Sequence, residues 1–238
     1  MKTGTYTAGM IIVLVVSWVI LGAGTPANAQ TSGNWGLYLG LNVANMTGDT
    51  DEFNQRLVEF MEDEFGDEWT VTNKTRTGFL GGAYYHLPLS GKFGIQVEGL
   101  WAKRGMKQEF STDVFAADVS WGLNYVEFPL LMRWSPSPGG KTGFFCILGA
   151  VIGLNTSADM TVSSGDESDT VNEGADFKST AYSAVGGIGL ETRIADTTSL
   201  HEQARYQLGL SSVLEDSEYS LRSSDFSIVA GLGFSLSP

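Results

Sequence analysis

The chain has 238 residues, and its 27 acidic and 14 basic side chains give a formal net charge of -13 at pH 7. Such an acidic chain repels nucleic acid and attracts cations, so nucleic acid is excluded as a partner. Its one cysteine, Cys146, has no second cysteine in the chain with which to form a disulfide.

The segment 1–29 is predicted to be a signal peptide. Lys2 precedes an apolar run at 10–21, and the tripeptide Ala-Asn-Ala at 27–29 is typical of a small-residue cleavage site. The apolar run is shorter than the roughly 20 residues that a membrane-spanning helix needs, which disfavours a transmembrane anchor. We therefore expect Sec-dependent export of the chain, with residues 30–238 forming a single domain.

Beyond this segment, apolar and polar residues alternate in eight stretches of about ten residues or more, which suits tilted strands that cross a membrane. The stretches are 33–45, 74–86, 92–103, 119–134, 142–155, 179–193, 199–212 and 223–236. Their connections alternate between short ones, at 87–92, 135–141 and 194–199, and longer polar ones, at 46–73, 104–118, 156–178 and 213–222. Outer-membrane barrels have short periplasmic turns and longer external loops. The sequence thus predicts an all-β fold, an eight-stranded antiparallel up-and-down transmembrane β-barrel with both chain ends in the periplasm.

The first long connection contains a pattern typical of an amphipathic helix. Five apolar residues recur at helical spacing opposite a strongly acidic face: Phe53, Leu57, Phe60, Met61 and Phe65. We predict a short helix here. Two interpretations remain open, a lid packed over the barrel mouth and a surface that docks a partner.

The stretch LNYVEFPLLMRW at 123–134 indicates which face of the strands points inward. With a period of two it separates into an apolar face, Val126, Phe128, Leu130, Met132 and Trp134, and a face that carries the charges, Tyr125, Glu127, Pro129, Leu131 and Arg133. Lipid penalises charge near the membrane midplane, so the charged face is predicted to line the lumen. Pro129 removes a ladder donor and is predicted to mark a bulge.

Charged residues elsewhere in the strands extend this argument to a lumen ion-pair network. Its predicted members are Glu98, Glu127, Arg133, Glu191, Arg193 and Arg205, with Gln96, Gln203, Gln207, Gly187, Gly189 and Gly209 on the same inward face. Glu127 is expected to pair with Arg205. The interior of eight strands is only wide enough to be filled by side chains, so we expect a plug that stabilises the barrel and no open pore. The alternative is a gated path for protons or ions.

Aromatic residues near the strand ends predict two girdles at the membrane interfaces. Those at the periplasmic ends are Trp35, Tyr85, Phe93, Trp134, Phe144 and Phe234, and those at the outer ends are Trp101, Trp121, Tyr182 and Phe226. A further loop, 163–176, is rich in acids, but its spacing does not match a calcium loop. It is interpreted as a solvated loop, with weak divalent-cation bridging to lipopolysaccharide as the alternative.

Four stretches together resemble the bacterial outer membrane protein beta-barrel domain family, whose members are often labelled porin family proteins. They are IQVEGLWAKRG at 95–105, LNYVEFPLLMRW at 123–134, GGIGLETR at 186–193 and ARYQLGLSSV at 204–213. The resemblance covers the chain after the signal peptide, and it implies a location in the outer membrane of a Gram-negative cell envelope and a small barrel architecture.

The expected role is structural or one of surface interaction. The expected partners are outer-membrane lipid, lipopolysaccharide and the barrel assembly machinery, together with an extracellular partner at the acidic loops, and the expected state is a monomer. No catalytic residue, cofactor or metal site is predicted. A lipid-modifying enzyme needs a histidine at the outer rim, whereas His86 and His201 fall at periplasmic strand ends. The other alternative is a soluble lipocalin-like binder, in which the apolar face would line a ligand cavity.

Overall fold

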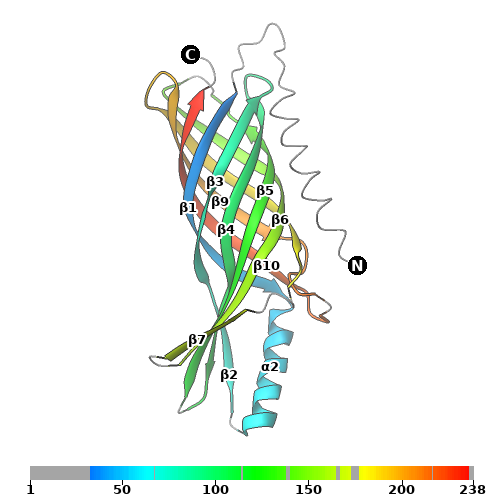
Figure 1. The fold of residues 1–238 in the computed structure, drawn as a ribbon. Coiled ribbons are helices and arrows are strands. Elements are labelled where there is room, and N and C mark those ends of the chain that lie inside the picture. Colours follow the sequence, from blue (N-terminus) through cyan, green and yellow to red (C-terminus); the bar gives the residue numbers. More distant parts are fainter. Residues whose placement is uncertain are drawn as a thin grey trace. The chain divides into compact units, whose positions relative to one another are not determined.

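Eight antiparallel strands pair in a closed ring in the computed structural model (Figure 1). They are β1 (Asn34–Gly48), β3 (Arg76–Pro88), β4 (Phe93–Ser111), β5 (Ala116–Trp134), β6 (Thr142–Ser164), β8 (Thr180–Arg193), β9 (Thr198–Gly209) and β10 (Leu221–Ser235). Each strand pairs with its neighbour in the ring, and the pairing of β1 with β10 closes it. The predicted barrel and its eight strands are confirmed.

The structure describes residues 33–66, 68–113, 115–137, 140–164, 167–172, 177–215 and 217–235. Residues Ser32–Pro238 belong to one compact unit. The predicted signal peptide at 1–29 lies outside the described residues.

The register shows how far the strands tilt. The chain of paired residues that leaves Asn34 through His86 on β3 passes once around the ring and returns to β1 at Ala44, ten residues further along. With a rise of about 3.3 Å per residue and strands about 4.8 Å apart, this stagger corresponds to a tilt of about 40°. The tilt lies in the range of transmembrane barrels.

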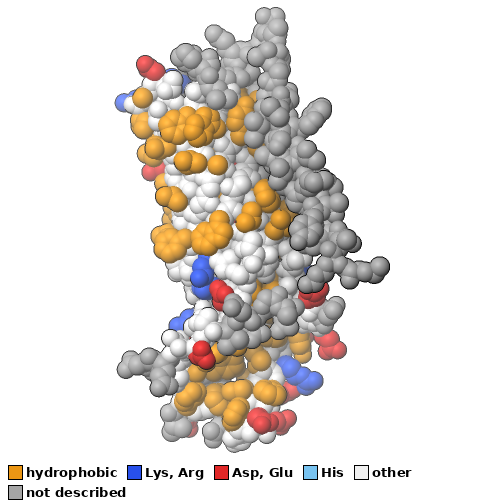
Figure 2. All heavy atoms as spheres, viewed as in Figure 1, with side chains coloured by type: hydrophobic (Ala, Val, Ile, Leu, Met, Phe, Trp, Pro, Cys, Tyr) orange, Lys and Arg blue, Asp and Glu red, His pale blue; other side chains and the backbone are white. Residues whose placement is uncertain are grey.

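The two faces of the strands differ as the sequence predicts. In β5, Leu130 and Met132 point outward and are exposed, while Glu127, Leu131 and Arg133 are buried inside. Outward apolar side chains are exposed in the same way on other strands, for example Leu39 of β1, Ile188 of β8 and Ile228 of β10, and Figure 2 shows hydrophobic side chains on the barrel surface. Glu202 on β9 is an exposed carboxylate on this outward face, close to the end that carries the short turns.

Aromatic side chains mark two levels of the outer surface. On β4 they are Phe93 and Trp101, and on β10 they are Phe234 and Phe226, eight residues apart in each strand. Eight residues along a strand tilted by about 40° span roughly 20 Å of the barrel axis, close to the ~25 Å apolar band of outer-membrane barrels. One predicted member is wrong, because Trp121 packs against buried residues at the barrel mouth.

The bulge predicted at Pro129 is also wrong. The register of β5 with β4 is the same on both sides of Pro129, and Pro129 itself pairs with Val151 of β6. The register shift lies instead between Asn124 and Tyr125, where Thr156 of β6 is the extra residue. Pro129 has no amide hydrogen, and the strand accommodates this loss without inserting a residue.

The two ends of the barrel differ in their connections. Short turns at 89–92, 135–141 and 194–197 lie at one end, which we call the short-turn end. At the other, the loop end, β4, β5 and β6 continue well past the barrel wall. The predicted loop at 104–118 is therefore mostly strand, because β4 runs to Ser111 and β5 begins at Ala116.

Three more elements join these long strands. They are helix α2 (Thr50–Phe65), strand β2 (Thr70–Lys74), which pairs with β4, and strand β7 (Glu167–Asn172), which pairs with β6. The result is a five-stranded antiparallel sheet in the order β2-β4-β5-β6-β7, which with α2 we call the outer extension (Figure 1). The predicted helix is confirmed, and β7 lies where the sequence predicted a solvated loop. No helix within the described ranges has the length and apolarity needed to cross a membrane.

Candidate functional site

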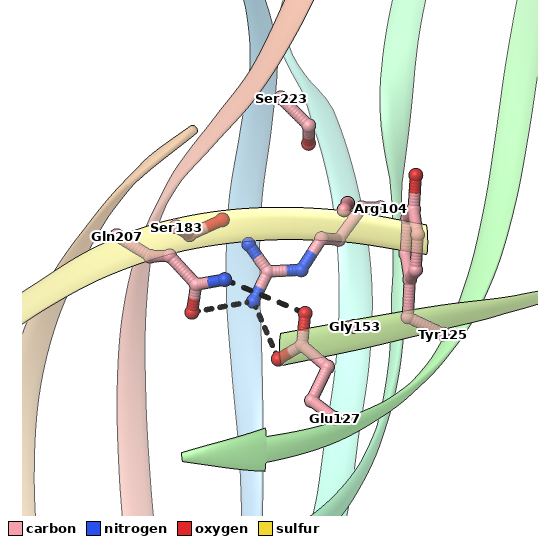
Figure 3. A pocket seen from close by; sticks show the side chains of 8 residues that line it. Arg104, Tyr125, Glu127, Gly153, Ser183, Gln207 and Ser223 are labelled. Atoms are coloured by element: carbon pink, nitrogen blue, oxygen red, sulfur yellow. Dashed lines mark hydrogen bonds and ion pairs between the residues drawn. The ribbon is translucent and has the colours of Figure 1, made fainter. Parts of the chain in front are cut away.

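The lumen holds three layers of paired charges, and the layer nearest the loop end is organised by Arg104. Its guanidinium donates to Glu127 Oε2 at 2.9 Å and Gln207 Oε1 at 2.9 Å, and it also pairs with Asp225. Gln207 donates in turn to Glu127 Oε1 at 3.4 Å (Figure 3). A cavity beside Arg104, Tyr125 and Glu127 has a volume of about 10 Å³, enough for one water molecule at most.

The middle layer is built on Arg205. This guanidinium donates to both oxygens of Glu98, at 2.6 and 2.8 Å, and to Gln203 Oε1 at 2.8 and 2.6 Å. Gln96 donates to Glu98 at 2.5 Å and to the hydroxyl of Tyr38 at 3.3 Å, and Gln203 also donates to that hydroxyl. Arg205 and Glu98 thus form a bidentate pair, in which two guanidinium nitrogens donate to the two carboxylate oxygens, and this is a strong form of ion pair.

The layer nearest the short-turn end centres on Arg133. It pairs with Glu191, and its guanidinium carbon lies 3.7 Å from the centre of the Phe145 ring. His201 is completely buried beside this pair, with its Nε2 3.6 Å from Glu191 and 2.9 Å from Ser199 Oγ. Both contacts use the same ring nitrogen, so the three side chains lack the geometry of a catalytic triad, in which the acid and the serine bind opposite nitrogens.

Glycines on the inward face make room for the large rings of the lumen. The rings of Tyr38 and Tyr84 stack with their centres 4.3 Å apart. A Cβ at Gly231 would lie 2.5 Å from the Tyr38 ring, and a Cβ at Gly36 would lie 2.4 Å from the Tyr84 ring. Any larger residue at these two positions would therefore displace the tyrosine pair that packs beside the Arg205 layer.

Beyond the three layers, apolar side chains cluster at the mouth of the barrel. This mouth cluster comprises Met46, Met106, Leu123, Tyr125, Ala158, Phe177, Val213 and Leu221, all buried. Phe177 and Val213 come from connections outside the strands, and residue 177 forms an isolated bridge with Leu214. Helix α2 contributes only Phe53 to the edge of this cluster. The interpretation of the helix as a lid over the mouth is therefore wrong.

The structure brings together five of the six residues predicted for the lumen network. Glu98, Glu127, Arg133, Glu191 and Arg205 each form at least one ion pair there. The sixth, Arg193, is exposed at the short-turn end of β8 and forms no ion pair among the described residues. The expected pairing of Glu127 with Arg205 is also wrong, because these two side chains belong to different layers.

Two residues of the network were missed by the sequence reasoning, Arg104 and Asp225. Arg104 falls in a stretch expected to be a loop, yet it continues the inward alternation of Gln96, Glu98, Leu100 and Ala102 along β4. That alternation is the signal that would have found it. Asp225 has Ser223 and Ser227 as its neighbours on the same face of β10, so no apolar pattern marks that face around it.

The outer extension is the second candidate site. At its base, where the extension leaves the barrel, side chains take the place of the backbone hydrogen bonds between β3 and β4. β3 pairs with β4 only as far as Ala102. Beyond that point Asn42 donates to the carbonyl of Lys103 at 3.1 Å, and Arg76 donates to the carbonyls of Arg104 at 2.9 Å and Trp121 at 3.2 Å. These contacts satisfy carbonyl groups that would otherwise lose their partners. Asn42 and Arg76 therefore hold the base of the extension.

Helix α2 is attached mainly at its first turns. Asn54 accepts a hydrogen bond from Gln108 at 2.9 Å, and the ring of Phe53 lies 5.8 Å from that of Tyr219 in an edge-on contact. No residue of the 16-residue helix is fully buried. On its exposed side Arg56 donates to Glu59 at 3.2 Å, and this hydrogen bond raises the pKa of the guanidinium. The far half of the helix is thus held by few contacts.

A closed ring of antiparallel strands with lipid-compatible side chains outside and paired charges inside is a transmembrane β-barrel. Residues 28–215 match the model of the outer membrane protein beta-barrel domain family, and the chain belongs to that family. It is therefore an outer-membrane protein. None of the curated proteins matches the sequence.

Several solved structures are similar to this chain. One is Ail, the attachment invasion locus protein of Yersinia pestis, with 14% identity over 85% of this chain and 99% of that chain and a TM-score of 0.40. Another is the outer membrane protein OprG from Pseudomonas aeruginosa, with 12% identity over 87% and 97% and a TM-score of 0.42. A third is Neisserial surface protein A, with 10% identity over 84% and 96% and a TM-score of 0.43.

The lumen chemistry overturns the soluble lipocalin-like alternative. A lipocalin would need an apolar cavity, whereas here the described lumen contains three guanidinium groups paired with carboxylates, and the cavity beside Arg104 has room for one water molecule at most. Among the residues that the structure describes, no group of three or more histidine, cysteine or acidic side chains is placed to hold a metal ion.

Proposed function

We propose that this protein is a closed outer-membrane anchor that displays the outer extension at the cell surface for interaction with another molecule. The observation that supports the proposal is the series of paired charges and apolar side chains along the barrel interior. Three ion-paired layers and the mouth cluster occupy it in succession, and breaking any buried pair leaves a charge without its partner. Such a lumen offers no continuous water path, so neither solute diffusion nor a gated ion path is favoured.

The orientation follows from the two ends of the barrel. Short turns of outer-membrane barrels face the periplasm, and larger connections face outward. The short-turn end therefore lies in the periplasm, and the outer extension lies outside the cell. Sec-dependent export and insertion by the barrel assembly machinery bring the chain to the outer membrane. There the outward apolar band contacts lipid on the periplasmic side and lipopolysaccharide on the outer side. The protein acts as a monomer without catalytic groups, cofactor or metal.

Two measurements on one protein test this proposal. Purified protein in liposomes should give no solute flux above that of empty liposomes. In intact cells, a membrane-impermeant thiol reagent should label Ser163→Cys in β6 of the extension but not Ser137→Cys in a short turn, both in a Cys146→Ser background. Flux through the wild-type protein would refute the closed lumen, and labelling of position 137 alone would reverse the orientation.

A further inference from the structure

The outer extension has one polar and one apolar face. On the polar face, Lys107 pairs with Asp118 at 2.8 Å and Lys74 pairs with Glu109, among serines and threonines of all five strands. The register puts the apolar side chains on the opposite face, where Trp121 is paired with Met106 and Met160, and Val119 with Val162. Helix α2 lies beside β2 on this second face, because Asn54 contacts Gln108 there.

The apolar face is left partly open beyond the base of α2. We call the open part the apolar patch, and its main members are Phe60, Phe65, Trp69, Phe115, Val119 and Val162. Phe60 and Phe65 of the helix are 62% and 61% exposed, and Phe115 is 45% exposed. The ring of Trp69 lies 6.1 Å from those of Phe65 and Phe115, so the aromatic part is continuous from helix to sheet. Figure 2 shows hydrophobic side chains gathered on this part of the molecule.

This patch is outside the membrane band, so lipid does not explain its exposure. The aromatic level at Trp101 marks the loop-side edge of the band on β4, and Phe110 lies nine residues beyond it on the same strand. Nine residues span more than 20 Å along the barrel axis at a tilt of about 40°. A contiguous exposed apolar surface in water marks an interaction site.

The net charge of the extension indicates what kind of molecule can bind the apolar patch. The segments that form the extension, 50–74, 107–120 and 157–172, contain 15 acidic and three basic residues, so they carry -12 of the chain's net -13. The three basic residues, Arg56, Lys74 and Lys107, each pair with a carboxylate. The rim of the patch therefore attracts cations and repels anions.

The helix itself places acids where they disfavour its own stability. Glu62, Asp63 and Glu64 lie in the last turn of α2, and this turn contains no basic residue. The C-terminal end of a helix carries a partial negative charge, so acids there are unfavourable. A cationic ligand would offset the unfavourable interaction between these acids and the helix end. The three acids are therefore better explained by ligand binding than by helix stability.

We propose that the apolar patch binds a cationic amphipathic peptide segment, with its apolar side on the aromatic residues and its basic side toward the acids of α2. This inference rests on the proposed display of the extension at the cell surface. A second copy of the chain would bring two segments of charge -12 together, and an anionic lipid surface would be repelled in the same way. The face of an 18-residue helical ligand is about 27 Å long, comparable with the ~24 Å of α2.

The test uses an 18-residue peptide of leucine and lysine with all leucines on one helical face, carrying a fluorescent label. The full-length mature protein is placed in phosphatidylcholine nanodiscs, and anisotropy is read against empty nanodiscs. Wild-type protein should bind this peptide, and binding should weaken as salt rises. It should not bind a peptide of the same pattern with glutamate in place of lysine.

Two variants and their matched controls separate the apolar from the charged contribution. Phe60→Ser with Phe115→Ser should weaken binding about tenfold or more, whereas Leu89→Ser, an equally exposed residue in a short turn, should not. Glu62→Gln with Glu64→Gln should weaken binding about tenfold at low salt, whereas Asp196→Asn with Glu215→Gln should not. The Glu→Gln variant also removes unfavourable negative charge from the C-terminal end of α2, so unfolding of the helix would not explain its loss of binding.

The proposal is overturned if wild-type protein ignores the leucine-lysine peptide, or if the patch variants bind it as tightly as their controls do. It is also overturned if concentrated wild-type protein dimerises through the patch, with loss of the dimer in the Phe60→Ser, Phe115→Ser variant. None of these outcomes depends on solute flux or on thiol labelling of the extension. The failure of this inference is therefore distinct from a failure of the closed, outward-facing anchor.

Discussion

The barrel and the outer extension differ in where their charged side chains lie and in how far these charges are balanced. Inside the barrel, three arginines face four carboxylates, and each guanidinium is buried against its partners. In the extension, 15 acids face three bases, and the ion pairs lie at the solvent surface. Charge in the lumen therefore holds the structure together, because an unpaired buried charge is costly. Charge in the extension contributes little to stability and is available for recognition.

The largest expected effect is that of Arg104→Ala, which leaves Glu127 and Asp225 buried near each other without their shared cation. We expect the free energy of unfolding to fall by about 3–5 kcal/mol. Arg104→Lys keeps the positive charge but loses the planar guanidinium with its several donors, so the free energy of unfolding should fall by less. Urea titration followed by heat-modifiable gel migration measures both. A loss below about 1 kcal/mol, similar to that of the exposed Arg56→Ala, would contradict the importance of the lumen pairs.

The next effect compares the outer surfaces of the two regions. Leu39 is 76% exposed in the middle of the lipid-facing side of β1, and Val162 is 38% exposed in the extension. Leu39→Arg should destabilise the inserted protein by about 2–4 kcal/mol, because it places a charge in hydrocarbon. Val162→Arg should leave insertion unchanged. The two are measured by the folded fraction in lipid vesicles, and equal folding of both variants would mean that β1 does not face lipid.

A double-mutant cycle sharpens the comparison within the lumen. Glu98→Ala and Arg205→Ala should show a coupling energy near the upper end of the ~0.5–3 kcal/mol range of contacting residues. Glu127→Ala and Arg205→Ala belong to different layers and should couple much more weakly. The free energies of unfolding of the single and double variants provide the measurement. The reverse order of coupling would restore the pairing of Glu127 with Arg205 that the sequence suggested.

The smallest expected effect lies in the extension. Lys107 and Asp118 are each more than a third exposed, and their pair should contribute about 0–1 kcal/mol to the free energy of unfolding. The coupling measured in Lys107→Ala and Asp118→Ala variants should decrease further at high salt, because screening acts fully on exposed charges. Coupling as strong as that of Glu98 with Arg205 would remove the distinction between the two regions.

The sequence predicted the barrel better than the extension for a physical reason. Lipid outside and a narrow lumen inside impose strict alternation, and the residues around Glu127 show it plainly. In the extension, water replaces lipid on one sheet face, and the covered face of β4 mixes the polar Gln108 with the apolar Met106 and Phe110. The stretch after Lys103 therefore alternates less clearly in sequence and was expected to be a loop. Strand β7 lay in an acid-rich segment for which the same argument holds.

Ion-pair partners were harder to predict than lumen residues. Periodicity identifies which side chains point inward, but the partner across the lumen depends on the ten-residue stagger of the ring. That stagger follows from register, which no single strand reveals. Glu127 therefore received the wrong arginine, and Arg193 was included although it lies past the end of the lumen.

Hydrogen exchange on the folded protein in nanodiscs tests the contrast between the two regions most directly. Amide groups of β8 and β9, which lie beside the Arg205 layer, should exchange only through global unfolding. Amide groups in the far half of α2 and in β2 should exchange by local opening at a much lower free energy, since few contacts hold them. Addition of the leucine-lysine peptide should slow exchange in α2 and β2 and leave β8 and β9 unchanged. Equal protection in all four elements would contradict a rigid anchor that carries a separately mobile recognition surface.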